Sequence, residues 1–290
     1  QEKGFFAANG LDVDIQHVST PGDNSPLLAA GTVQFSTSDA SELLNKRAGD
    51  PALPIVSIAL IGQTGQQGFA VLADSGIETP ADWAGKTAGF KGSTVTPDYL
   101  EILAANGVDR DSIEEVRVGF EPQVLTEGQV DIFPVFLSNE PDTLDRLGYP
   151  TKVFTAADYG APTLGLTYTA TEDYIAENPD VVRRFVDAAL RGIAYADLNR
   201  DEAIDIVMQY AAGADREHQR YMLDTELEMA KKGEAATNGI GYQTLDQWQA
   251  LHDYQVQYGG IPKALDDVSK AFGNFQPGPQ MTPPPPTSTR

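Results

Sequence analysis

Two short sequence patterns recur in this chain at one constant spacing. Ala-Ala-Asn-Gly ends at Gly10 and again at Gly107, and a second pattern, in which a glycine precedes a strand-like run and a polar loop, contains Gly31 and again Gly128. In both pairs the glycines are 97 residues apart. Such a repeat favours two lobes with similar local topology. The alternative is convergence, because a glycine that ends a helix before a strand is a common local device.

The second copy of the longer pattern, 125–144, predicts where a ligand binds. Its apolar run, 132–136, is typical of a buried strand, and Asn139 and Glu140 follow directly. Ligands of α/β sheets bind beyond the carboxyl ends of strands. Asn139 suits the cap of a helix that starts with Glu140 and Pro141, but an unpaired carboxylate beside a buried strand is costly. We therefore predict that Glu140 accepts hydrogen bonds from a ligand.

The remaining chain alternates strand and helix patterns, as expected for an α/β protein. Residues 11–15 alternate at the strand period, and 54–61 form a continuous apolar run suited to a central strand buried on both faces. Three glycines in the turn 62–68 indicate either a flexible turn or close backbone approach to a ligand. From 178 to 258 the pattern is mainly helical.

The expected domain division follows from these elements. Residues 1–87 form part of a first lobe, 88–170 form a second lobe, and 171–275 return to the first lobe as a mainly helical segment. The proline-rich end, 276–290, has almost no apolar anchors, so we expect it to be disordered. A ligand for a partner's proline-binding groove is the alternative.

The composition argues against several function classes. The chain has 42 acidic and 20 basic residues and a net charge of −22, which opposes binding to nucleic acid or anionic lipid. There is no cysteine, and His17, His218 and His252 show no zinc-binding spacing, so surface or capping roles are expected for them. No P-loop or nucleophile elbow occurs. We expect no catalytic residue, metal or cofactor.

Several motifs, taken together, resemble one protein family. They lie at 2–13 (EKGFFAANGLDV), 30–35, 76–86 and 128–141. The combination is similar to the solute-binding proteins of ABC importers. More narrowly, it resembles the branch related to thiamine-pyrimidine-precursor synthesis proteins, which also includes nitrate, sulfonate, taurine and riboflavin binders. The resemblance extends from about residue 1 to 260.

The resemblance implies a two-lobe α/β fold of the type II periplasmic-binding-protein class, in which a ligand is clamped between the lobes. It implies an ABC importer permease as partner, and we expect a monomer. It also implies an extracytoplasmic location, with a signal peptide or lipid anchor on a segment preceding Gln1, and a strand and loop before Glu2 that help to line the site. Enzymes of this branch, the pyrimidine synthases, use a cysteine-rich motif, so the absence of cysteine favours a binder.

The charge expected at the site suggests the ligand class. A carboxylate at Glu140 would repel an anion ~4 Å away by about 4 kcal/mol at an effective dielectric of 20, whereas it accepts well from ring N–H groups. We therefore expect a planar nitrogen heterocycle, such as a thiamine pyrimidine precursor or riboflavin. Alternatives are a nitrate, sulfonate or taurine binder centred on Ser93 and Thr94, a pyrimidine-synthase-like enzyme, and a sensor input domain. The expected ligand-binding residues are Ser38, Asp39, Gln63, Gln66, Ser93, Thr94, Phe120, Asn139, Glu140 and Tyr168.

Overall fold

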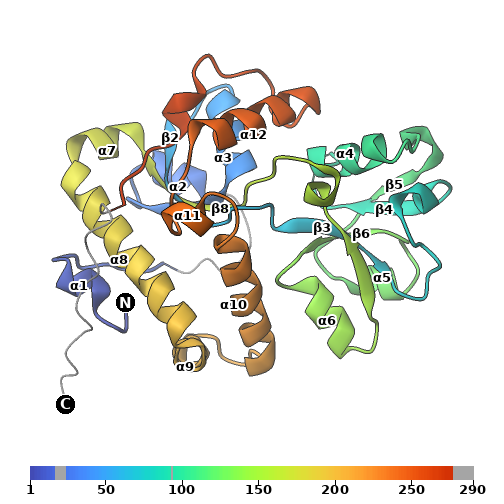
Figure 1. Cartoon of the computed structure of the whole chain (residues 1–290), viewed down its shortest axis with the longest axis horizontal. Helices are drawn as coiled ribbons and strands as arrows, with labels where there is room; N and C mark the ends of the chain where they lie inside the picture. The colour runs from blue at the N-terminus through green and yellow to red at the C-terminus, as the bar shows by residue number, and fades with distance from the viewer. Residues whose placement is uncertain (17–23, 93, 277–290) are drawn as a thin grey trace.

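The computed structural model describes residues 1–16, 24–92 and 94–276, which form two α/β lobes side by side (Figure 1). The first lobe combines the N-terminal part of the chain with its helical C-terminal part, and the middle of the chain forms the second lobe. Ser93, His17 and all of the expected 276–290 tail except Gln276 fall outside the described residues.

The first lobe contains a three-stranded antiparallel sheet in the order β1-β8-β2. All six residues of the β2 strand are buried, as expected, but among the described strands of this sheet β8, and not β2, is the central one. The elements of this lobe are α1 (Phe5–Ala8), α2 (Ser25–Ala29), β1 (Ser36–Asp39), α3 (Ala40–Ala48), β2 (Ile55–Leu60), β8 (Leu166–Thr171), α7 (Glu172–Glu177), α8 (Pro179–Leu198), α9 (Arg200–Tyr210), α10 (Arg216–Ala230), α11 (Ala235–Asn238), α12 (Leu245–Gln257) and η4 (Val268–Ala271).

The second lobe contains an antiparallel group, β6-β3-β7, and a parallel pair, β4-β5. A parallel bridge between Ala88 and Ile132 joins β4 to the start of β6, so β4, β5 and β6 end at the same edge. The elements of this lobe are β3 (Gln67–Leu72), η1 (Pro80–Trp83), β4 (Thr87–Phe90), α4 (Pro97–Ala105), η2 (Arg110–Ser112), β5 (Glu114–Arg117), α5 (Gln123–Thr126), β6 (Phe133–Phe136), α6 (Glu140–Arg146), β7 (Thr151–Phe154) and η3 (Ala156–Tyr159).

The strand pairing differs from the expected lobe boundaries at 87 and 170. The β3 strand pairs with β6 and β7, and β8 pairs with β1 and β2. The pairing therefore favours crossovers at 61–66 and 160–165. In sequence, β2 and β3 look like consecutive strands of one sheet because only a short turn separates them, whereas the partners of β3 come from distant parts of the chain.

The two crossovers pack backbone against backbone. Gly62 N donates to Leu166 O, and Gly165 N donates to Gly62 O, both at 2.8 Å. A Cβ on Gly62 would lie 2.6 Å from Leu166 N, closer than a side chain tolerates. Glycine at this position therefore allows the two crossovers to approach each other closely. The sequence predicted that the turn 62–68 is either flexible or close to a ligand. In the structure its backbone instead contacts the other crossover.

The sequence repeat corresponds to a repeated local structure. Gly10, Gly31, Gly107 and Gly128 all have positive φ, between 64° and 70°. After each of them, the next N–H donates to the carbonyl five residues earlier, at 2.9–3.0 Å, which is the Schellman arrangement that ends a helix. Each lobe therefore carries one copy of each pattern with the same local geometry.

Residues 11–15 do not form the expected strand. Residues 11–16 pair with no strand in the part of the chain that the structure describes. Instead, Leu11 packs with Phe6 against the cluster that contains Phe185 of α8. The alternating pattern thus reflects one-sided packing of an extended segment, which has the same period as a strand.

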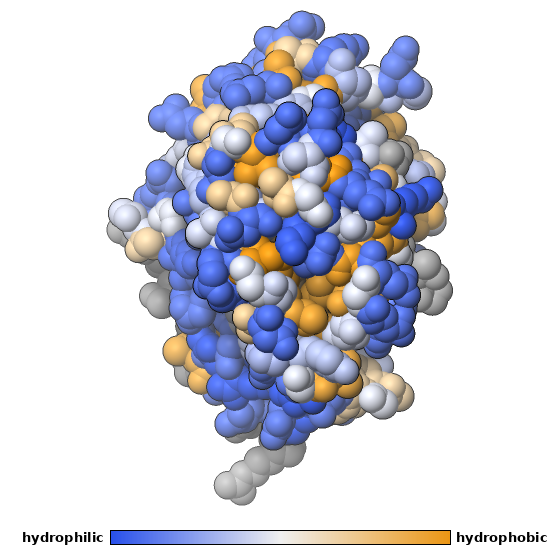
Figure 2. Space-filling view, turned by 90° about the vertical axis from the view of Figure 1, so that its right-hand side faces the viewer, coloured by the Kyte–Doolittle hydropathy of each residue, from blue (hydrophilic) through white to orange (hydrophobic). Residues whose placement is uncertain are grey.

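The lobes contact each other on two sides, through α12 and α4 and through α10 and the loop after β6. At the first contact, Tyr254 of α12 donates to Asp98 of α4 at 3.0 Å. Figure 2 looks onto the end of the second lobe, where hydrophilic residues surround smaller apolar areas. None of the described helices is long and apolar enough to cross a membrane.

Candidate ligand site at the ends of three parallel strands

One ammonium group lies where the three parallel strands of the second lobe end. Lys91 follows β4, Phe120 lies three residues beyond β5, and Phe136 is the last residue of β6. Lys91 Nζ lies 4.7 Å from the ring centre of Phe133, 5.4 Å from that of Phe120 and 5.7 Å from that of Phe136. Glu140, the first residue of α6, lies 2.6 Å from the same Nζ. We call Lys91, Phe120, Phe136 and Glu140 the second-lobe site.

The carboxylate of Glu140 is fully engaged inside the second lobe. Glu140 is 4 % exposed, and its Oε1 accepts from Lys91 while its Oε2 accepts from Phe136 N at 2.7 Å. The expected repulsion of anions by an unpaired Glu140 is therefore wrong, because Lys91 neutralises this charge. The partner was missed because it lies 49 residues away in sequence. A cationic residue directly after a predicted strand was the available signal.

Asn139 does not cap α6 as expected. It occupies the cap position without a side-chain cap bond, and its Oδ1 lies 3.0 Å from His218 Nε2 of α10. His218 Nδ1 lies 2.6 Å from Asp142, so the expected surface or capping role of this histidine is also wrong. Burial raises the pKa of Asp142, but hydrogen bonds from His218 and Arg146 outweigh it and hold that pKa below its usual value. This cluster links the two lobes beside the second-lobe site.

A second contact between α10 and the second lobe involves Gln66. Glu226 of α10 accepts from Ser138 at 2.7 Å and also from the Gln66 amide. Tyr221 of the same helix donates to Leu137 O at 2.9 Å. Gln66, expected to bind ligand, therefore lies at the junction of the first crossover, α10 and the loop after β6.

Gln63 and Tyr168 lie in the first lobe, away from this junction. Gln63 is 3 % exposed; its amide donates to Leu60 O and Tyr242 O, and its Oε1 accepts from Gln247. The ring of Tyr168 packs edge-on against Phe185 of α8, with centres 5.9 Å apart. Tyr168 lines a hollow of about 900 Å³ between the sheet and α8. Neither residue is brought together with Glu140.

Thr96, and not the expected ligand-binding residue Thr94, caps the start of α4. Thr94 is exposed, whereas Thr96 Oγ1 accepts from Tyr99 N at 3.4 Å and occupies the cap position. The third histidine of the sequence, His252, is buried and its Nε2 accepts from Leu265 N at 3.0 Å. It has a structural role in the first lobe.

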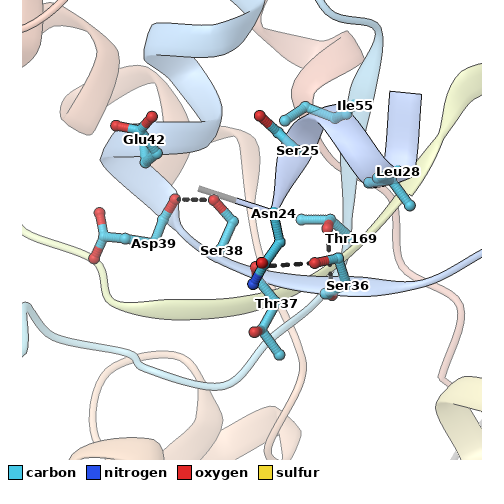
Figure 3. Close-up of a pocket in the computed structure, with 10 residues that line it drawn as sticks. All are labelled: Asn24, Ser25, Leu28, Ser36, Thr37, Ser38, Asp39, Glu42, Ile55 and Thr169. Atoms are coloured by element: carbon cyan, nitrogen blue, oxygen red, sulfur yellow. Dashed lines mark hydrogen bonds between the residues drawn. The ribbon is translucent and has the colours of Figure 1, made fainter. Parts of the chain in front are cut away.

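Ser38 and Asp39 line a cavity of about 140 Å³ in the first lobe, together with Asn24 and Ser25 (Figure 3). Asp39 Oδ1 accepts from Ser41 N at 2.8 Å and so caps α3. Figure 3 shows Ser38 and Asp39 side by side on the strand that enters this helix.

Two partly buried carboxyls, one in each lobe, have raised pKa values. Burial raises the pKa of Asp39 to about 6. Burial also raises the pKa of Asp98, at the start of α4, to about 6, and the charge of Asp39 adds to this effect. Tyr254 of α12 donates to Asp98 and the adjacent Gln255 donates to Ser41 of α3, so the starts of α3 and α4 both contact α12.

These elements match one known family. The NMT1/THI5-like family profile matches residues 1–203. The chain belongs to the NMT1/THI5-like family. Within the described residues of this NMT1/THI5-like chain, no group of three or more histidines or carboxylates is arranged to hold a metal ion.

Similar proteins include two binders of small heterocycles and one sulfonate binder. The formylaminopyrimidine-binding protein of Halalkalibacterium halodurans is 28% identical over 272 residues, covering 88% of this chain and 80% of that protein. The riboflavin-binding protein RibY of Chloroflexus aurantiacus is 29% identical over 289 residues, covering 95% and 80%. The periplasmic aliphatic sulphonate binding protein SsuA from Escherichia coli has a TM-score of 0.63 at 16% identity, covering 85% of this chain and 77% of that one. This likeness confirms the expected periplasmic-binding-protein fold.

Proposed function

We propose that this NMT1/THI5-like protein is the extracytoplasmic solute-binding subunit of an ABC importer and binds a planar nitrogen heterocycle between its lobes. The observation that carries the proposal is the second-lobe site. There the side chains of Phe120 and Phe136 are 58% and 41% exposed, beside the ion pair of Lys91 and Glu140, which has no net charge. Exposed ring faces at the ends of parallel strands fit a flat ligand. The relatives named for formylaminopyrimidine and riboflavin support the same ligand class.

We propose that the protein binds its ligand without catalysing a reaction. The pyrimidine synthases of the branch that this chain resembles depend on cysteine, and this chain has none. The ligand would stabilise the closed arrangement of the lobes, which α10 already joins through Glu226 and His218. We propose the importer's permease as the protein partner, recognising one closed copy of the chain.

A second candidate ligand is a sulfonate or nitrate. One observation favours it: the Lys91 ammonium lies at the site and removes the net negative charge that Glu140 would otherwise present. Anion binding would use Lys91 together with Thr94 and the start of α4. It makes no use of the exposed rings of Phe120 and Phe136, which is why the heterocycle is the main proposal.

A thermal-shift screen separates the two candidates. The ligands are riboflavin, formylaminopyrimidine, ethanesulfonate, taurine and nitrate, each tested at increasing concentration. A ligand at 100 times its dissociation constant adds about 2.7 kcal/mol to the free energy of unfolding. We expect riboflavin or formylaminopyrimidine to stabilise the protein. We expect no stabilisation by ethanesulfonate, taurine or nitrate. Stabilisation by ethanesulfonate or nitrate alone would contradict the heterocycle proposal.

A further inference from the structure

Lys91 is the one cation of the second-lobe site as defined above, and its side chain is 13% exposed. An ammonium carries three N–H donors. Among the described residues, Lys91 makes one hydrogen bond, to Glu140, and otherwise faces the rings of Phe120, Phe133 and Phe136. Aromatic faces attract a cation but accept hydrogen bonds poorly. The remaining donors are therefore available for a stronger acceptor.

The position of the ammonium is fixed by its surroundings. Phe133 is fully buried beneath it, and Glu140 is held by the backbone N–H of Phe136 as well as by Lys91. Because both oxygens of Glu140 have partners, this carboxylate would have to break a charge-assisted hydrogen bond to contact a ligand. Lys91 can contact a ligand without breaking any.

We propose that Lys91, and not Glu140, contacts the ligand directly, donating a hydrogen bond to a carbonyl oxygen at the edge of a planar ring that stacks on Phe120 or Phe136. This inference rests on the proposed function and narrows its ligand class to heterocycles that carry a carbonyl acceptor. Glu140 is then a positioning residue that holds the ammonium. The ion pair as a whole is neutral, so a neutral ligand suits it.

The ring faces restrict the orientation of such a ligand. Phe120 follows β5 and Phe136 ends β6, so the two rings flank Lys91 from the strands on either side of β4. A flat ring that covers either face has its edge beside the ammonium, which lies within 6 Å of both ring centres. An acceptor placed at the ring edge meets Lys91, and a purely apolar edge leaves its donors unused.

The test compares formylaminopyrimidine with the same aminopyrimidine lacking its formyl carbonyl, by calorimetric titration. The main variant is the double substitution Lys91→Met with Glu140→Gln, because Lys91→Met alone leaves a buried carboxylate without its cation. The amide oxygen that Glu140→Gln introduces can still accept from Phe136 N. The matched control uses Lys152 of β7, which pairs with Glu78 in the same lobe. The control variant is Lys152→Met with Glu78→Gln.

We expect the wild-type protein and the control to prefer the formylated compound, and the double variant to lose that preference by about 10- to 100-fold. Lys91→Arg keeps a donor and should retain part of the preference. Wild-type binding with an unchanged preference in the double variant would overturn this inference alone. If the wild-type protein binds neither pyrimidine nor riboflavin, the proposed function fails, and this inference fails with it.

Discussion

Glu226 Oε1 accepts a hydrogen bond from Ser138 Oγ at 2.7 Å, and this bond joins α10 of the first lobe to the loop after β6 in the second. The same carboxylate accepts from Gln66 in the first crossover. Three segments that are distant in sequence thus meet at one side chain, next to the second-lobe site. Glu226 therefore contributes to the contact between the two lobes.

Removing the Glu226 carboxylate should loosen the closed arrangement. In Glu226→Ala, Ser138 and Gln66 lose a charged acceptor, which weakens lobe closure by about 1–3 kcal/mol. We expect a larger radius of gyration by small-angle X-ray scattering and weaker ligand binding by calorimetry. Glu228→Ala is the control, since Glu228 lies on the same helix but pairs with Arg200 and Lys231 within the first lobe. Equal effects of the two substitutions would contradict a specific role for Glu226.

The contact between the crossovers should not tolerate a side chain at position 62. Gly62→Ala places a Cβ 2.6 Å from Leu166 N, so the two crossovers must separate. We expect a loss of about 1–3 kcal/mol in the free energy of unfolding, measured by urea denaturation. The control is Gly192→Ala in α8, where a Cβ meets no atom within 4 Å and the helix should gain stability. If Gly62→Ala left the free energy of unfolding unchanged, the close contact between the crossovers would not require glycine.

Asp98 should make stability fall as the pH rises. Its pKa of about 6 is above that of an unfolded aspartate, so the folded state holds its proton more tightly and this stabilisation is complete below about pH 4. It is lost as the pH rises through 6. Asp98→Asn keeps an acceptor for Tyr254 and removes the titration. The variant should therefore gain about 1–3 kcal/mol relative to wild type between pH 4 and 7.

Urea denaturation of both proteins at pH 4, 5, 6 and 7 measures this difference. Taking the difference cancels the titration of groups that do not interact with Asp98. Asp74→Asn, at an exposed position in the second lobe, is the control for replacing an aspartate by asparagine. A constant difference for Asp98→Asn would show that Asp98 titrates in the folded state as in an unfolded chain.

Phe120 should contribute to ligand affinity through its exposed face. Phe120→Leu keeps an apolar side chain but removes the ring, and we expect affinity for riboflavin to fall by about 3- to 10-fold, the value of one aromatic pair. Tyr149→Leu replaces another exposed aromatic residue of the same lobe, between α6 and β7, and should not change affinity. Fluorescence titration of riboflavin is suitable for both variants. An unchanged affinity in Phe120→Leu would remove this ring from the site.

Local patterns in the sequence predicted local structure well. The apolar run at β2 and the glycines that end helices in both lobes depend on neighbours a few residues away. Such features are encoded in short segments. The assignment of β3 failed because its partners, β6 and β7, are distant in the chain and nothing in β3 itself specifies them.

At the second-lobe site, too, features set by nearby residues were predicted and features set by distant residues were not. Phe120 and Glu140 were expected at the site because they follow apparent strands, and the structure brings them together. The Lys91 to Glu140 pair depends on the arrangement of the strands, which no local pattern reveals. Gln63 and Tyr168 also follow or lie within strands, but their side chains are engaged within the first lobe.

The most direct test of binding between the lobes is hydrogen–deuterium exchange of the wild-type protein with and without saturating formylaminopyrimidine, and again with riboflavin. We predict slower exchange at 91–96 and 118–121, in the loop 136–140, and along α10. Slower exchange confined to the first-lobe hollow beside Tyr168 and Phe185 would contradict binding between the lobes. Unchanged exchange throughout with both ligands would contradict the heterocycle proposal itself.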